Sequence, residues 1–173
     1  MVWFVTENLL KTSGIIDANV DATKISPLIQ FSAKAFVQPM IGTYFFNDLA
    51  VKYNNQTLSV DETALVAKMQ TPIIWRACAQ AGLTLSFPLT NKGYLKQIDD
   101  NAQAPEIKEI TFMYDHYVAQ AKLFEKELFD YLVLNKDLFP VFLDKLNVDS
   151  NIKLNQNNFK GQNYNESNGF FFI

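Results

Sequence analysis

The sequence predicts an all-α protein, a helical bundle of about four helices with a long internal loop and extended N- and C-terminal arms. About half of the 173 residues (49%) are hydrophobic, which is ample material for a core. Many of these residues recur at the three- and four-residue steps of an amphipathic helix. We expect a helical bundle domain with an N-terminal arm at residues 1–150 and an extended C-terminal arm at residues 151–173.

The N-terminal segment, residues 2–6, is apolar and β-prone, which predicts a short strand or an arm packed on a neighbour. We expect residues 7–20 to form a loop with at most one helical turn. The first helix has two candidate caps, Asp21 and Ser26. Pro27 suits a first-turn position after Ser26, because its missing N–H costs nothing there.

The second and third helices are marked by their boundaries. Pro39 interrupts the first helix, and a second one is predicted at about residues 40–53. Residues 54–56 (NNQ) indicate a turn. Ser59 and Glu62 have the spacing of a capping box, in which each side chain accepts a hydrogen bond from the other residue's backbone N–H. A third helix is therefore predicted to begin there.

The third helix carries apolar residues at steps of four: Leu65, Met69, Ile73, Ala77 and Ala81. Pro72 lies inside this run and cannot donate to the carbonyl of Lys68, so we expect it to kink or divide the helix. The helix is predicted to end between residues 82 and 88. Residues 89–104 then indicate a long loop or hairpin, of a length that is often functional.

The strongest periodic signal predicts a fourth, long helix between Pro105 and Asn135. Its heptad stripe consists of Ile107, Ile110, Tyr114, Tyr117, Ala121, Phe124, Leu128 and Tyr131. About 30 residues would give roughly 45 Å of helix. We interpret it as a core helix of the bundle. The alternative is an intermolecular coiled coil, which three tyrosines in the seam disfavour. Residues 137–143 suggest a short extra helix or turn.

Composition argues against several function classes. A net charge of −3 does not fit a dedicated nucleic-acid binder. The start of the sequence lacks the pattern of a signal peptide, and no window approaches the 18 apolar residues of a membrane span. The single histidine, His116, and the single cysteine, Cys78, cannot supply a zinc site. We predict no catalytic residue, no cofactor and no metal, and a lone cysteine fits a reducing cytoplasm.

A small enzyme is one of two rival interpretations. It would use Asp115, His116 and a carboxylate, or would couple Glu125 with Glu106 or Asp130. No spacing singles out such a pair. The carboxylates of the long helix alternate with lysines, a pattern typical of a solvated face.

The two ends of the chain carry the clearest sign of assembly. Residues 151–173 hold seven asparagines and only three charged residues, and they close on the sequence GFFFI. Buried phenylalanines would each contribute roughly 1.5–3 kcal/mol, so the tail either folds back on its own body or docks on another chain. We favour docking on another chain. The predicted anchors are Trp3, Phe4, Phe159, Tyr164, Phe170, Phe171, Phe172 and Ile173.

Four short stretches carry a resemblance to a known family. They are residues 37–43 (VQPMIGT), 90–93 (TNKG), 134–140 (LNKDLFP) and 164–171 (YNESNGFF). In this order they resemble a family of small virion structural proteins encoded by crAss-like phages and related phages of Bacteroidetes. That family looks like the head–tail connector, or neck ring, proteins of tailed phages.

The resemblance implies a structural role in a virion assembled in the cytoplasm of a host bacterium. It implies a homo-oligomeric ring, twelve-fold by analogy with portals, which contacts the portal and other neck or tail proteins. DNA would pass through without specific binding, and no membrane would be involved. Lys92 and Gly93 would face a partner ring or the lumen. The alternative is a helical adaptor or binding module outside virions that acts through its C-terminal tail.

Overall fold

The structure, a computed structural model, describes residues 3–13, 16–17, 19–86, 89–90, 93–94, 106–139 and 142. The predicted all-α class is confirmed. The elements are α1 (Glu7–Thr12), α2 (Ala22–Ser32), the π-helical segment η1 (Ala33–Val37), α3 (Gln38–Ile41), α4 (Thr43–Asn55), α5 (Val60–Ser86), the two-residue strands β1 (Leu89–Thr90) and β2 (Gly93–Tyr94), α6 (Ile107–Leu134) and the 3-10 turn η2 (Lys136–Leu138).

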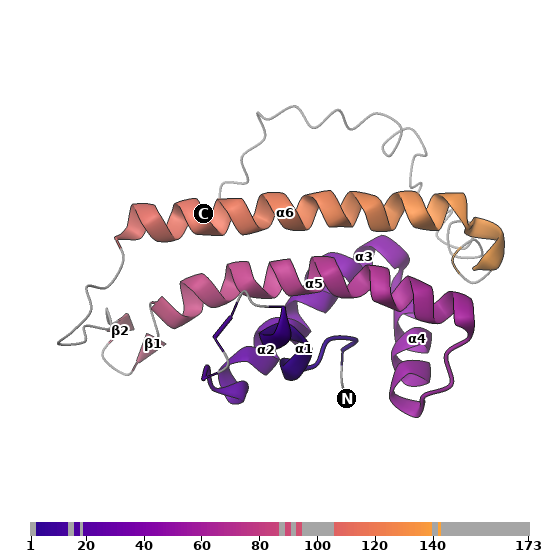
Figure 1. Cartoon of the computed structure of the whole chain (residues 1–173), viewed down its shortest axis with the longest axis horizontal. Helices are drawn as coiled ribbons and strands as arrows, with labels where there is room; N and C mark the ends of the chain where they lie inside the picture. The colour runs from indigo at the N-terminus through magenta and orange to yellow at the C-terminus, as the bar shows by residue number, and fades with distance from the viewer. Residues whose placement is uncertain are drawn as a thin grey trace.

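Helix α5 lies at the centre of the bundle (Figure 1). Helix α6 runs antiparallel along one side of it, and the two form the most extensive contact in the described part of the chain. Helices α1, α2 and α4 lie on the other side of α5 in this view. The main core is therefore built around α5, which has buried residues along most of its length.

The first helical stretch runs from Ala22 to Ile41 without the predicted break at Pro39. Asp21 caps it, since its carboxylate accepts a hydrogen bond from the N–H of Thr23 at 2.9 Å. Pro27 lies inside α2 and not in its first turn, so that expectation was wrong. The wider π-helical turn of η1 ends two residues before Pro39, whose ring and missing N–H disturb regular α-helical bonding.

The break comes instead at Gly42, whose φ of 87° lies in the left-handed region. Glycine adopts this conformation at little cost, so the chain turns there and α4 begins at the next residue. Helix α4 ends at Gln56, which is also left-handed, with φ of 57°. The predicted second helix and the turn after it are confirmed to within two to three residues.

The capping box at the start of α5 is confirmed. The N–H of Ser59 donates to Glu62 Oε2 at 2.8 Å, and the N–H of Glu62 donates to Ser59 Oγ at 3.2 Å. Pro72 does not divide the helix, which continues to Ser86. Its apolar neighbours Met69 and Ile73 are fully buried, and this packing holds the helix together across the proline.

Helix α6 is confirmed over its predicted length, and its stripe faces α5. Ile110, Ala121 and Leu128 are buried, whereas Ile107 at the exposed N-terminal end is not. The four aromatic residues of the stripe are partly buried, so its packing against α5 supports the core interpretation for all of it except Ile107. At the other end, Phe139 after η2 contacts the ring of Phe45 at a centroid distance of 5.8 Å. This contact ties the end of α6 to α4.

The other predicted irregular segments are described only in part. Within residues 89–104, strands β1 and β2 pair antiparallel, with Leu89 opposite Tyr94 and Thr90 opposite Gly93. The rest of that loop lies outside the described residues. The predicted C-terminal arm, residues 151–173, also lies outside them.

Candidate interaction surfaces

The N-terminal segment is bound to its own chain. Phe4 is fully buried, with its ring edge-on to Phe46 and Tyr53 at centroid distances of 5.2 and 5.6 Å. Its φ of 64° turns the backbone sharply, and its carbonyl accepts a hydrogen bond from Gln70 Nε2 at 2.8 Å. Trp3 stacks on Phe46 at 5.7 Å, and Lys34 lies 4.6 Å from the centre of its ring.

These contacts correct the expectation for Phe4. A side chain with no exposed surface cannot anchor the chain on a neighbouring subunit, and Phe4 instead completes the core beside α4 and α5. Trp3 is half-buried on the same patch. The apolar character of this segment is thus satisfied within the chain.

A buried ion pair joins the two long helices. Arg76 of α5 donates two hydrogen bonds to Glu125 of α6, from Nε to Oε1 at 2.7 Å and from Nη2 to Oε2 at 2.9 Å. The guanidinium also lies 4.0 Å from the ring centre of Phe36 in η1. Three elements therefore meet at Arg76. Its two hydrogen bonds to Glu125 have the bidentate geometry that is favoured in carboxylate recognition.

Both carboxylate oxygens of Glu125 accept hydrogen bonds from Arg76. Glu106, one proposed acid–base partner, lies 19 residues away on the same helical stretch, which corresponds to about 28 Å. The sequence reasoning missed the pair because its members are 49 residues apart, and no local pattern links them.

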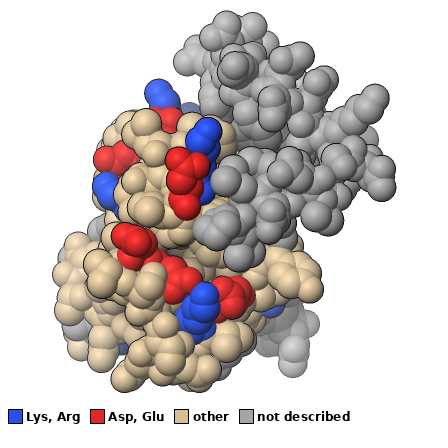
Figure 2. Space-filling view, turned by 90° about the vertical axis from the view of Figure 1, so that its right-hand side faces the viewer, with Lys and Arg blue, Asp and Glu red and all other residues tan. Residues whose placement is uncertain are grey.

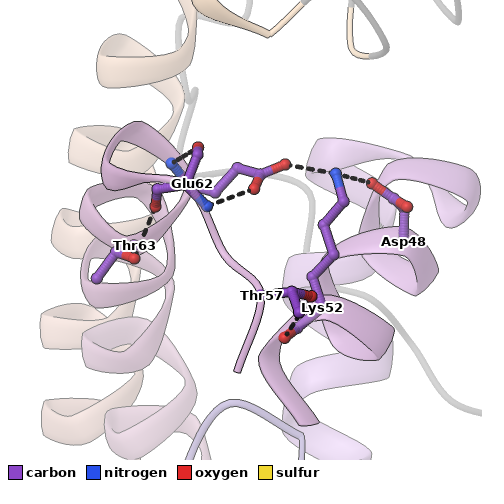
Figure 3. A network of polar contacts seen from close by, with 6 residues as sticks. Asp48, Lys52, Thr57, Glu62 and Thr63 are labelled. Atoms are coloured by element: carbon purple, nitrogen blue, oxygen red, sulfur yellow. Dashed lines mark hydrogen bonds and ion pairs between the residues drawn. The ribbon is translucent and has the colours of Figure 1, made fainter. Parts of the chain in front are cut away.

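A second polar network joins α4 to α5, as Figure 3 shows. Lys52 Nζ lies 2.8 Å from Asp48 Oδ2 and 2.7 Å from Glu62 Oε1. Hydrogen bonds to Asp48 and Glu62 raise the pKa of Lys52 above its usual value. Burial raises the pKa of Glu62, but the hydrogen bonds from Lys52 and from the N–H of Ser59 outweigh it, so the net shift is downward.

The reactive side chains do not form a site among the described residues. Cys78 is buried, and burial raises the pKa of its thiol to about 12, so it stays protonated at neutral pH. His116 is exposed on α6, with its ring 6.0 Å from that of Tyr117. Within the described ranges, no three His, Cys, Asp or Glu side chains gather as a metal site would require.

The outward side of α6 carries exposed apolar side chains. Phe112, Leu123 and Leu134 are 71%, 59% and 82% exposed. They are spaced by 11 residues, close to three helical turns, so they form one line on the side away from α5. We call these three residues the outer line. The 11-residue spacing of the outer line is visible in the sequence. It was not predicted because the buried stripe of the same helix is the stronger periodic pattern.

Residues 37–152, 116 of the 173 in the chain, match the model of a family described as a family of unknown function (DUF6712). The chain belongs to the DUF6712 family. No curated protein and no solved structure matches it. The part that defines membership in DUF6712 contains the α5–α6 pair, the Arg76–Glu125 contact and the outer line. It does not contain Trp3 or Phe4.

The other predicted contact residues can be placed only in part. Gly93 lies in β2, opposite Thr90. Lys92, Phe159, Tyr164, Phe170, Phe171, Phe172 and Ile173 lie outside the described residues. On the face shown in Figure 2, basic and acidic side chains are interspersed and form no patch of one sign. None of the helices in the described ranges has both the length and the apolar character of a membrane span.

Proposed function

We propose that this DUF6712 chain is a structural subunit of a bacteriophage neck or head–tail connector ring that joins the portal to the tail. The proposal starts from the four sequence stretches that resemble virion proteins of crAss-like phages. The observation that supports it best is the α5–α6 pair, because two long antiparallel helices locked by a buried bidentate ion pair make a stiff spine. Among the described residues, Phe112, Leu123 and Leu134 on one side of α6 are exposed and could meet another molecule.

The chemistry of the described residues also fits a structural role better than catalysis. Cys78 is protonated and buried, Glu125 is engaged by Arg76, and His116 lies on the helix surface. In the proposed ring, the arm at residues 159–173 docks on an adjacent subunit. Its aromatic residues supply the apolar surface that stabilises such contacts.

Assembly of the purified full-length protein tests the proposal. We expect sedimentation to detect a large homo-oligomer, and electron micrographs to show closed rings with a central opening. Deleting residues 159–173 should leave the helical circular dichroism unchanged and should lower the mass of the assembly. The matched control replaces residues 154–158 by a Gly/Ser sequence. This stretch has similar solubility but no aromatic residues, so the rings should remain intact.

Two results would contradict the proposal. A strict monomer at all concentrations would favour a helical adaptor outside virions that acts through its tail. A truncated protein that unfolds would show that the tail belongs to the core of its own chain.

A further inference from the structure

The outer line of α6 is part of a pattern that is symmetric about Leu123. Phe112 and Leu134 lie 11 residues to either side of it, and His116 and Asp130 lie seven residues to either side. Steps of seven and 11 residues are close to two and three helical turns, so all five side chains fall on one narrow strip of the helix. All five are exposed.

We infer that this strip is a two-fold contact with α6 of a second copy of the chain, packed antiparallel with Leu123 at its centre. In a two-fold interface, where residue i of one copy contacts residue j of the other, residue j of the first copy contacts residue i of the second, and only residues on the axis meet their own copies. In this arrangement Leu123 meets Leu123 of the second copy, and each Phe112 meets a Leu134. The apolar residues at the ends lie about 16.5 Å from the centre along the helix, so the two helices must be nearly aligned to reach them.

Charge decides the direction of packing. A parallel pair in the same register would bring Asp130 against Asp130 and His116 against His116. The antiparallel pair brings each His116 against Asp130 of the second copy, a donor against an acceptor in either protonation state of the imidazole. Lys126 then lies level with Gln120 of the second copy, and Glu127 lies level with Ala119, so neither is level with a like charge.

The same pattern argues against the C-terminal arm as the occupant of this strip. A bound peptide would need apolar contacts but would place no symmetry requirement on the helix. The order Phe, His, Leu, Asp, Leu complements itself when it is reversed, and this is the property that self-pairing requires.

We expect the contact to be weak. Only three apolar side chains per copy line a single helix face, which is less than a standard interface provides. A dissociation constant on the order of 10–100 µM is expected. This inference does not depend on the proposed ring, because ring neighbours meet through unlike surfaces. Within a ring assembly, the two-fold contact would join two rings face to face.

Sedimentation of the full-length protein over a range of concentrations tests the contact. Leu123→Glu places two carboxylates against each other at the centre and should weaken the pairing at least about 30-fold. At high concentration this variant should have half the mass of the wild type, whether that is a monomer instead of a dimer or one ring instead of two. Val60→Glu is the matched control, because Val60 is 86% exposed at the start of α5, outside the strip.

A charge exchange tests the antiparallel register. His116→Asp opposes two aspartates and should weaken pairing about 10-fold. Adding Asp130→Lys to the same chain restores opposite charges and should return the affinity to within about threefold of wild type. Failure of the double variant to recover would overturn the antiparallel register.

Two further outcomes separate this inference from the proposed function. If Leu123→Glu pairs as tightly as wild type, the two-fold contact is refuted, whatever the fate of the rings. If deletion of residues 159–173 abolishes all association while Leu123→Glu has no effect, the arm alone drives assembly and the inference fails. If the deletion removes the rings but leaves a pair that Leu123→Glu dissociates, the two-fold contact is supported.

Discussion

Removing the carboxylate of Glu125 should destabilise the fold more than removing a carboxylate from any other described ion pair. The side chains of Arg76 and Glu125 are only 10% and 16% exposed. Breaking a buried pair by removing one partner costs about 3–5 kcal/mol, because the remaining charge is left without its acceptor. The remaining Arg76 charge is partly stabilised by its residual exposure to water and by the nearby ring of Phe36, which reduces this cost. We therefore expect Glu125→Ala to lower the free energy of unfolding by about 2–4 kcal/mol.

Urea denaturation followed by circular dichroism measures this loss, at one fixed protein concentration because association would add to stability. The matched control is Glu127→Ala on the same helix. Its partner Lys68 lies 3.9 Å away, and the two side chains are 58% and 47% exposed, so the loss should be below about 0.5 kcal/mol.

A double variant separates the charge from the packing. Arg76→Met with Glu125→Leu should recover most of the stability, since apolar residues of similar size often replace a buried ion pair without loss. A loss below about 1 kcal/mol for Glu125→Ala would refute the reasoning, because it would mean that the pair does not hold α5 against α6.

Three further predictions follow from the described contacts. Glu62→Gln should destabilise the protein at pH 7, and the difference from wild type should shrink as the pH falls through the lowered pKa of Glu62, below its usual 4.5. Denaturation at pH 7 and pH 3 measures this, and a gap that stays constant would contradict it. Gly42→Ala should cost about 1–2 kcal/mol, because φ is 87° there; a neutral change in thermal unfolding would contradict this. Cys78 should react with a thiol reagent at pH 8 only after denaturant is added, because it is 2% exposed with a pKa of about 12. Rapid labelling of the native protein would disprove that.

The sequence was sufficient where short-range chemistry decides the structure. Ser59 and Glu62 carry a two-residue capping signal, and the structure forms it as predicted. The stripe of α6 repeats often enough that the core-facing side of this helix could be predicted from spacing alone, although spacing does not identify α5 as its partner. In both cases the information lies within a few helical turns.

The sequence was insufficient to predict the structure where tertiary packing outweighs a local rule. Proline is a helix breaker by propensity, yet Pro27 and Pro72 lie inside helices whose apolar faces are buried. Before Pro39, at residues 33–37, the helix widens into a π-helical turn, an alternative that composition does not distinguish from a break. The burial of Phe4 depends on Phe46 and Tyr53, more than 40 residues away, so an exposed arm was the natural expectation from the sequence.

The two tryptophans of this chain occupy different sides of its central helix. Trp3 stacks on Phe46 of α4, whereas Trp75 lies against Tyr117 and Phe124 of α6, at centroid distances of 5.8 and 6.4 Å. Each indole is thus an intrinsic fluorophore for one half of the bundle. Single Trp→Phe variants would report separately whether the α4 side and the α6 side melt in one cooperative step, without any added label.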